Sequence, residues 1–300
     1  MKGSLVAATG AAFSRQLLAQ SAGSTGASGG VGDIVDTNVH LFGWPFRNLK
    51  YGETDKLVAK LRQHGIRQAW AGSFEALLHK DIDGVNRRLV DACRQHRGFL
   101  IPFGAVNPLW PGWEEDLRRC HETYRMPGIR LHPSYQGYEL SHPDFARLML
   151  LASERRMLVQ IVIELEDERV HHPKMITPDT NPLPVVDLLK ELPRGRVQFL
   201  NFFGVVRGDK LKAIQGMLSS PQVLFDIANL EGAGALQKAL AGEDTVGLQL
   251  KVPLKRLAFG SHAPYFPIQN SLFKFMESRL ESRDLTAIMS GNAARFMAPA

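Results

Sequence analysis

Short apolar segments rich in β-branched residues alternate with longer amphipathic segments from residue 33 onward. The short segments are apolar along nearly their whole length, which is typical of strands buried on both faces of a parallel sheet. The expected strands are 34–42, 67–74, 100–107, 128–132, 158–166, 196–203, 223–230 and 256–261. The longer segments repeat apolar residues at helical spacing and predict helices over 55–65, 85–96, 113–124, 143–156, 184–192, 209–218, 234–242 and 269–280.

Eight strands, each followed by a helix, predict an α/β fold, a single (β/α)8 TIM barrel over residues 33–300. A doubly wound open sheet is the main alternative. That fold normally carries a Gly-rich turn after its first strand, whereas this chain reads HLFGWPFR there. The expected barrel also contains no Walker loop and no G-x-S-x-G elbow, so the sequence favours neither a nucleotide-binding nor a serine-hydrolase site.

Residues 1–32 differ from the rest of the chain. They carry Lys2 and Arg15, no acidic residue, and many Gly, Ala, Ser and Thr residues. A cation, a short and weakly apolar run and then small residues are typical of an export signal, here similar to the second half of a twin-arginine signal. We expect 1–32 to be a flexible leader and Gly/Ser linker that directs export to the periplasm, with a disordered cytoplasmic tail as the alternative. The run is too short to anchor the chain in a membrane.

Charge narrows the class of partner. The 36 Lys and Arg residues exceed the 30 Asp and Glu residues by six, and removing the two cations of the leader leaves +4 for the barrel. The remaining cations are scattered among acids, with no basic stripe and no basic run interleaved with aromatic residues. We therefore expect a small-molecule substrate rather than nucleic acid.

Polar side chains gather where the expected strands end. In a (β/α)8 barrel the carboxyl ends of the strands form the active-site face. The residues that we single out there are Asn38, His40, Arg130, His132, Glu164, Glu166, Asn201, Asp226 and His262. Because the strand bodies are apolar, this set predicts one convergent polar site at the mouth of the barrel.

The loop after the first expected strand carries Trp44 and Arg47. An aromatic wall and a cation over the mouth suit an anionic or sugar-like substrate, and we assign Trp44, Arg47, Arg130 and Asn201 to substrate binding. The alternative for this loop is hydrophobic capping of the barrel.

Five short motifs resemble the amidohydrolase superfamily, in particular the branch of amidases, lactonases and metal-dependent decarboxylases. The motifs are DTNVHL at 36–41, GIRLHP at 128–133, FLNFFG at 199–204, FGSHAP at 259–264 and GNAARFM at 291–297. The resemblance covers about residues 33–298. It implies a TIM barrel that holds a divalent metal with two histidines of strand one, a histidine of strand five and an aspartate of strand eight.

This chain departs from that ligand set. Asn38 stands at the first histidine position and His262 at the aspartate position, strand five offers Glu164 and Glu166, and only His40 is unchanged. In one hypothesis a divalent metal, expected to be Zn²⁺, is held within the set His40, Asn38, Glu164, Glu166 and His262, although an amide oxygen is a poor zinc ligand. In the other, the metal is lost and His262 and His132 act as general acid and base.

The expected function is hydrolysis of a small lactone, amide or ester by water that the metal or a histidine activates. A metal-dependent decarboxylase of a small carboxylic acid is one alternative, and a silent barrel that only binds a ligand is another. The sequence does not fix the substrate or the oligomeric state.

Overall fold

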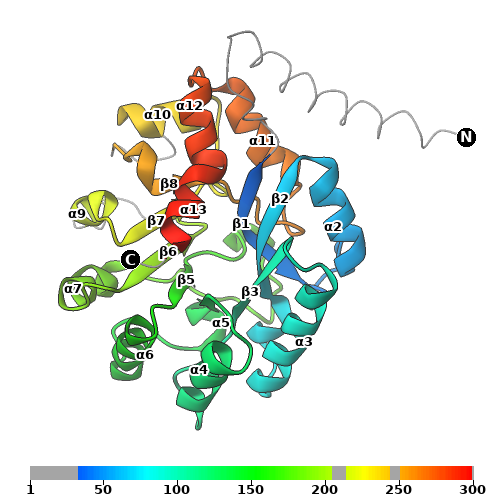
Figure 1. The fold of residues 1–300 in the computed structure, drawn as a ribbon, viewed down its shortest axis with the longest axis vertical. Helices are drawn as coiled ribbons and strands as arrows, with labels where there is room; N and C mark the ends of the chain where they lie inside the picture. The colour runs from blue at the N-terminus through cyan, green and yellow to red at the C-terminus, as the bar shows by residue number, and fades with distance from the viewer. Residues whose placement is uncertain (1–32, 205–213, 244–250, 299–300) are drawn as a thin grey trace, which may run out of the picture.

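The computed structural model describes residues 33–204, 214–243 and 251–298. Eight parallel strands follow one another in chain order within one sheet, and the helices surround them as an outer ring (Figure 1). The strands are β1 Ile34–Leu41, β2 Ile66–Ser73, β3 Leu100–Gly104, β4 Gly128–Leu131, β5 Leu158–Val162, β6 Arg196–Leu200, β7 Val223–Asp226 and β8 Leu257–Ala258.

The last strand returns to the first and closes the sheet. Val39 and Ala263 form a parallel bridge, and the Thr37 N–H donates to the Phe259 carbonyl at 2.9 Å. The predicted single (β/α)8 TIM barrel is confirmed. The leader expected over residues 1–32 lies outside the described residues.

Helices follow the strands as the apolar periodicity predicts. They are α2 Thr54–Gln63, η2 Phe74–Leu77, α3 Ile82–Gln95, α4 Trp113–Glu122, α5 Pro133–Gln136, α6 Pro143–Glu154, η3 Glu168–Val170, α7 Leu183–Glu191, α9 Gln215–Ser219, α10 Ala235–Ala241, η4 Leu254–Arg256, α11 Ile268–Glu277, α12 Ser282–Thr286, η5 Ala287–Gly291 and α13 Asn292–Met297. The helix expected over 209–218 is described only from residue 214. In the described ranges no helix is long and apolar enough to cross a membrane.

Some strands end earlier than their apolar pattern predicts. β5 ends at Val162 rather than at 166, and β7 ends at Asp226 rather than at 230. The apolar residues beyond these ends, such as Leu165 and Ile227, are buried although they belong to loops. Burial in loops over the mouth therefore produces the same apolar pattern as burial in a strand.

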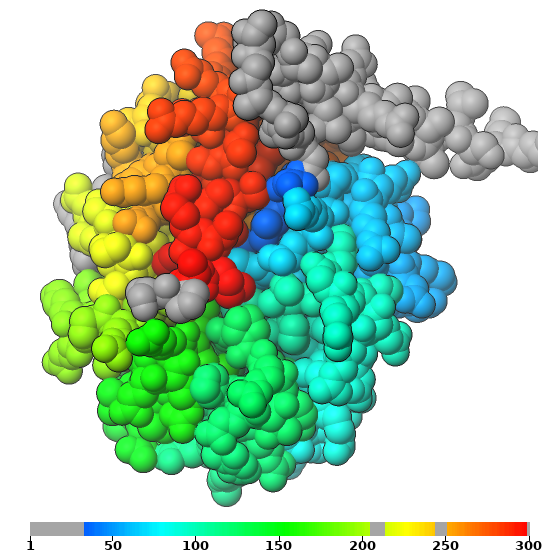
Figure 2. Space-filling model, in the orientation of Figure 1, coloured from blue at the N-terminus to red at the C-terminus, as the bar shows by residue number. Residues whose placement is uncertain are grey.

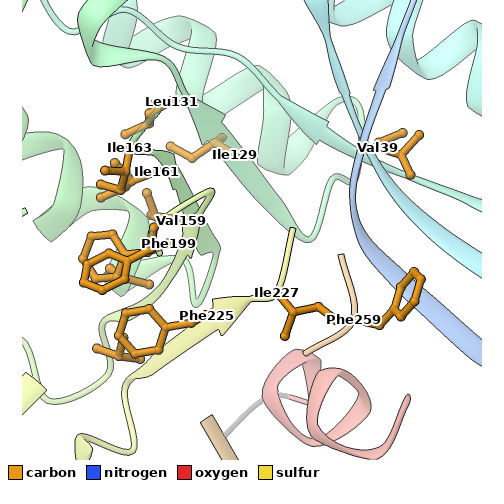
Figure 3. Packing of buried hydrophobic residues seen from close by; sticks show 14 of the residues in the cluster. Val39, Ile129, Leu131, Val159, Ile161, Ile163, Phe199, Phe225, Ile227 and Phe259 are labelled. Atoms are coloured by element: carbon orange, nitrogen blue, oxygen red, sulfur yellow. The ribbon is translucent and has the colours of Figure 1, made fainter. Parts of the chain in front are cut away.

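The main core lies between the strands and the surrounding helices. Side chains that alternate along successive strands point outward into this layer, among them Ile129, Val159, Ile161, Phe199 and Phe225 (Figure 3). The intervening residues point to the barrel axis, as the two-residue period of a strand requires. The side chains that point to the axis therefore determine the polarity and charge of the barrel interior.

The amino-terminal end of the barrel is sealed by apolar residues. α13 packs Ala293 and Phe296 against interior side chains that include Trp70 and Leu158. This helix crosses the end of the barrel that faces the viewer in Figure 1, and the space-filling view shows its atoms beside those of β1 (Figure 2). Access to the interior therefore comes from the opposite end, where the strands terminate.

A polar layer crosses the middle of the barrel. Arg130 Nε donates to Gln160 Oε1 at 2.8 Å, and Gln160 Nε2 donates to Gln198 Oε1 at 2.8 Å. Gln198 Nε2 donates to Thr37 Oγ1 at 2.7 Å. A Cβ on Gly72 would lie 2.6 Å from Arg130 Cδ, so the long guanidinium chain needs a glycine on β2. The layer is the floor of the candidate site.

Candidate active site

Three buried imidazoles meet above this floor. His40 is the last but one residue of β1, His132 follows β4 and His262 follows β8. The Nε2 atoms of His40 and His132 are 3.4 Å apart, and the ring centroids of His40 and His262 are 5.4 Å apart. Phe74 stacks on the His40 ring at 4.6 Å and holds its plane. The structure thus brings together three histidines that are far apart in the sequence.

Hydrogen bonds define where protons sit in this imidazole cluster. His262 Nε2 lies 2.9 Å from the Leu165 carbonyl, which can only accept, so Nε2 carries the proton. Nδ1 of neutral His262 is then the basic nitrogen, and it has no hydrogen-bond partner. In the His40–His132 pair one Nε2 donates to the other, which leaves one basic Nδ1 and one Nδ1 that carries a proton.

Burial keeps the imidazole cluster neutral. It lowers the pKa of His132 to about 3 and that of His262 to about 4, and it holds the pKa of His40 well below its usual value. The positive charge of Arg130 lowers all three pKa values further. At neutral pH the cluster therefore supplies both N–H donors and unprotonated nitrogens.

A second cluster joins amides and a carboxyl group beside the imidazoles. Asn38 Nδ2 donates to Asn201 Oδ1 at 2.7 Å and to Asp226 Oδ2 at 2.6 Å. Asp226 Oδ1 accepts the Asn201 backbone N–H at 3.1 Å. Burial raises the pKa of Asp226 to about 6. Asn201 Nδ2 donates to the Glu164 carbonyl at 2.7 Å, so both polar atoms of this buried amide are paired.

Asp36 is hydrogen-bonded to the backbone next to the cluster of Asn38, Asn201 and Asp226. Its Oδ1 accepts the backbone N–H groups of Asn38 at 3.1 Å and Ser261 at 3.0 Å, and so ties β1 to the segment after β8. Burial raises the pKa of this carboxyl group to about 7. No role was predicted for Asp36 from the sequence, although this residue opens the DTNVHL motif.

Two site residues adopt left-handed backbone conformations. Asn201 has φ 55° and His262 has φ 56°. A side chain at such a position costs about 1 to 2 kcal/mol and persists only where the surroundings fix it. Asparagine tolerates this conformation, so the strain lies mainly at His262, beside the other two imidazoles; Arg125 and Arg156 adopt it away from the site.

Arg130 does not reach the mouth as expected for a substrate-binding residue. Besides Gln160, its guanidinium donates to the carbonyls of Val39 at 2.6 Å and Trp70 at 3.0 Å. It is 1% exposed, and burial lowers its pKa to about 9, which leaves it charged at neutral pH. Its role in this structure is a fixed positive charge beneath the imidazole cluster.

The loop after β1 closes over the site. Trp44 is buried and packs edge-on against Phe74, with a centroid distance of 5.2 Å, so this residue caps the barrel. Arg47 Nη2 lies 2.7 Å from Glu166 Oε1, and Arg47 also bonds the Tyr265 hydroxyl. Glu166 accepts further bonds from Tyr265 at 2.7 Å and Tyr135 at 2.9 Å. We call Trp44, Arg47, Tyr135, Glu166 and Tyr265 the lid.

The proposed metal ligands are not assembled in this structure. Glu166 is part of the lid, and Glu164 Oε2 accepts from Asn229 Nδ2 at 2.7 Å instead of approaching His40 or His262. Asn38 directs its amide nitrogen to Asp226, as described above. Across the described part of the chain, no three His, Cys, Asp or Glu side chains form a group that could hold a metal ion. The donor set as arranged does not fit a divalent metal, and we derive no step through one.

A small cavity of about 10 Å³ lies beside the imidazole cluster and is lined by His132, Glu164, Glu166 and His171, among others. This is room for about one water molecule. Burial raises the pKa of Glu164, on its wall, to about 7. Two lid residues, Tyr135 and Glu166, line this cavity, so a larger substrate needs displacement of the lid.

The comparisons with known proteins agree with this architecture. The sequence model of the amidohydrolase family matches residues 35–202, which is more than half of the chain, so the protein belongs to the amidohydrolase family. A search of curated protein sequences returned no match.

Solved structures with the same fold are similar at low sequence identity. A 2,6-dihydroxybenzoate decarboxylase from Rhizobium is 14% identical with a TM-score of 0.65, covering 89% of this chain and 99% of its own. A 5-carboxyvanillate decarboxylase from Novosphingobium aromaticivorans, with bound manganese and 3-methoxy-4-hydroxy-5-nitrobenzoic acid, is 14% identical with a TM-score of 0.66 and coverage of 88% and 96%.

A third is a dihydroxybenzoic acid decarboxylase from Polaromonas, with bound manganese and 2-nitroresorcinol. It is 12% identical with a TM-score of 0.63, and the coverage is 89% and 97%. At such identities the likeness establishes the shared barrel. Two of these three structures hold manganese, which supports a divalent metal in proteins of this fold, and none of the three is described with zinc.

Proposed function

We propose that the protein decarboxylates a small aromatic carboxylic acid at the mouth of the barrel, with the imidazole cluster as the proton-transfer group. The observation that carries the proposal is the convergence of three buried, neutral histidines over the fixed charge of Arg130. The decarboxylases with the same fold support this substrate class. Hydrolysis, which we placed first from the sequence, has no counterpart among these three structures.

The chemistry follows from the electrostatics of the mouth. An anionic carboxylate is attracted by Arg130 from below and enters a site whose imidazoles are neutral. Its negative charge raises the pKa of the nearby histidines, so that binding takes up a proton, for example at His262 Nδ1. The bound substrate thereby acquires a proton donor that the free site lacks.

The proposed step balances with this one proton. The imidazolium gives its proton to the ring carbon that bears the carboxylate. The bond between the ring and the carboxyl carbon then breaks, its electron pair restores the aromatic ring, and carbon dioxide leaves. Closure of the lid again over the bound acid excludes water while the charge moves.

The test is release of labelled carbon dioxide from a panel of carboxyl-labelled hydroxybenzoic acids that includes 2,6-dihydroxybenzoate. We expect turnover by the wild type, and a loss of about 10²- to 10⁴-fold in kcat for His132→Gln and for His262→Asn. Asparagine is chosen at 262 because it tolerates a left-handed backbone. His79→Gln, an exposed histidine outside the site, is the matched control and should retain the wild-type rate.

The same assay separates the alternatives. Turnover that persists with a chelator supports proton transfer by this chain's own residues, whereas turnover that requires added manganese contradicts it. If no acid in the panel loses carbon dioxide, or if both site variants match the wild type, the proposal fails.

Hydrolysis remains a second candidate because of one observation, the water-sized cavity between His132 and Glu164. A parallel panel of small lactones and amides tests it. Hydrolysis of any of these by the wild type, abolished in His132→Gln, would favour water activation by that histidine.

A further inference from the structure

A second concave site lies on the flank of the barrel, outside the imidazole cluster. It is an open groove of about 610 Å³ between α2 and the segment that leads into α11. This volume falls within the range of small-ligand pockets, about 300–1,000 Å³. The groove and the lid have Tyr265 in common, and Asn48 and Leu49 of the loop after β1 also line the groove.

The charged groups of the groove are of one sign. Lys50 and Lys60 line it, and their Nζ atoms lie 5.6 and 5.8 Å from the centroid of the Tyr51 ring. The residues that line the groove include no Asp or Glu. Two ammonium groups gathered at one aromatic ring, without a carboxylate to neutralise them, create a positive potential that suits an anion.

His64 adds an unpaired polar group to the wall. It is 4% exposed, and neither of its ring nitrogens has a hydrogen-bond partner. Buried polar atoms are nearly always paired in proteins, so these two enclosed nitrogens are an unusual polar feature of the groove wall. Burial and Lys60 lower the pKa of His64 to about 4, so the ring is neutral and can donate one N–H.

The first turn of α11 contributes backbone donors. This ten-residue helix begins at Ile268, and Ile268 and Gln269 line the groove. No side chain caps the helix. Uncapped N–H groups at a helix start carry a partial positive charge and bind anions.

The remaining wall is apolar and aromatic. Tyr51 and Phe266 lie among aliphatic residues of α2 such as Leu57 and Leu61. A flat apolar body can therefore pack against the rings while its charged end meets the two lysines and the α11 terminus.

We propose that this groove is a binding site for a small aromatic carboxylate, separate from the active site. The carboxylate is held by Lys50, Lys60 and the first turn of α11, and the ring packs against Tyr51 and Phe266. This site lies on the flank of the barrel, and the proposal does not depend on the activity at the mouth.

The test uses benzoate as the probe and NMR spectroscopy as the readout. The methyl signals of two isoleucines serve as local reporters. Ile268 reports the groove, and Ile163, which lines the small cavity beside His132, reports the mouth. Benzoate should shift the Ile268 signal in a saturable manner. Benzamide, the neutral isostere, should bind about tenfold more weakly, because it lacks the charge that the lysines recognise.

The Lys50→Met/Lys60→Met double variant should weaken the Ile268 response to benzoate about tenfold and leave the Ile163 signal at its wild-type position. Lys80→Met, an exposed lysine elsewhere, is the control and should bind as the wild type does. The proposal is overturned if benzoate moves only Ile163, if benzamide binds as tightly as benzoate, or if the double variant binds like the wild type. None of these results bears on turnover at the mouth.

Discussion

Arg130 shows how one residue sets the electrostatics of the mouth. A guanidinium buried in a barrel would ordinarily pair with a carboxylate. Arg130 instead donates to the Gln160 amide oxygen and to the carbonyls of Thr37, Val39 and Trp70. Asp36 and Asp226 stabilise its charge from a distance. The net effect is a positive charge that cannot move and that favours neutral histidines above it.

Replacing Arg130 should therefore destabilise the fold. Arg130→Met leaves Gln160 Oε1 and the carbonyls of Val39 and Trp70 without this donor, and it removes the positive charge that interacts with Asp36 and Asp226 from a distance. We expect a loss of about 3 to 5 kcal/mol in the free energy of unfolding, measured by urea denaturation. Arg87→Met, at an exposed helix position, should change it by less than about 0.5 kcal/mol. Equal effects of the two substitutions would refute the role assigned to Arg130.

The histidines should make stability sensitive to acid. The pKa of His132 is about 3 in the folded protein and 6.5 as its reference value, so between these limits the unfolded chain binds one more proton. Stability from this residue is fully present above pH 6.5 and falls as the pH drops toward 3, by about 1.4 kcal/mol per pH unit.

His132→Gln removes this dependence. Between pH 4 and 5.5 the slope of the unfolding free energy against pH should be lower in the variant than in the wild type by about 1.4 kcal/mol per pH unit. Urea titrations at several pH values measure it, and His79→Gln should keep the wild-type slope. An unchanged slope in His132→Gln would mean that this imidazole is not held neutral.

At the scale of elements, the lid is built from segments that are distant in the chain. Arg47 and Glu166 are 119 positions apart, and the loops after β1, β5 and β8 must all be in place for their bond to form. A local sequence pattern cannot encode such a pairing. For this reason Arg47 and Glu166 were assigned to substrate and metal binding, whereas in the structure they bind each other.

Weakening the lid should expose the mouth. Glu166→Gln removes the charge that Arg47, Tyr135 and Tyr265 share, and we expect backbone amides of residues 43–49 to exchange hydrogen about tenfold faster. Glu168→Gln, two residues away on the exposed η3, is the matched control. Hydrogen-exchange mass spectrometry measures both. Unchanged exchange in Glu166→Gln would show that the lid does not depend on this carboxylate.

For the whole molecule, the order of strands and helices could be predicted because apolar runs of two kinds repeat regularly along the chain. The mouth could also be located, since His40, His132 and His262 all stand at strand ends. The direction of the Arg130 side chain could not be predicted, because it depends on Gly72 of β2, which is two strands away in the sheet. Asp226 carried a weak signal, a lone acid within the apolar run VLFDIANL, and its partner Asn38 becomes evident only in three dimensions.

The proposed function requires that the neutral imidazoles of this amidohydrolase barrel become charged when a carboxylate enters. Histidine side-chain NMR of the wild type, recorded across pH with and without a hydroxybenzoate substrate analogue, tests it most directly. We predict that His40, His132 and His262 stay neutral in the free protein down to pH 5, and that one of them is protonated at pH 7 when the analogue binds. Titration of these rings near pH 6.5 in the free protein, or no protonation on binding, would contradict the account.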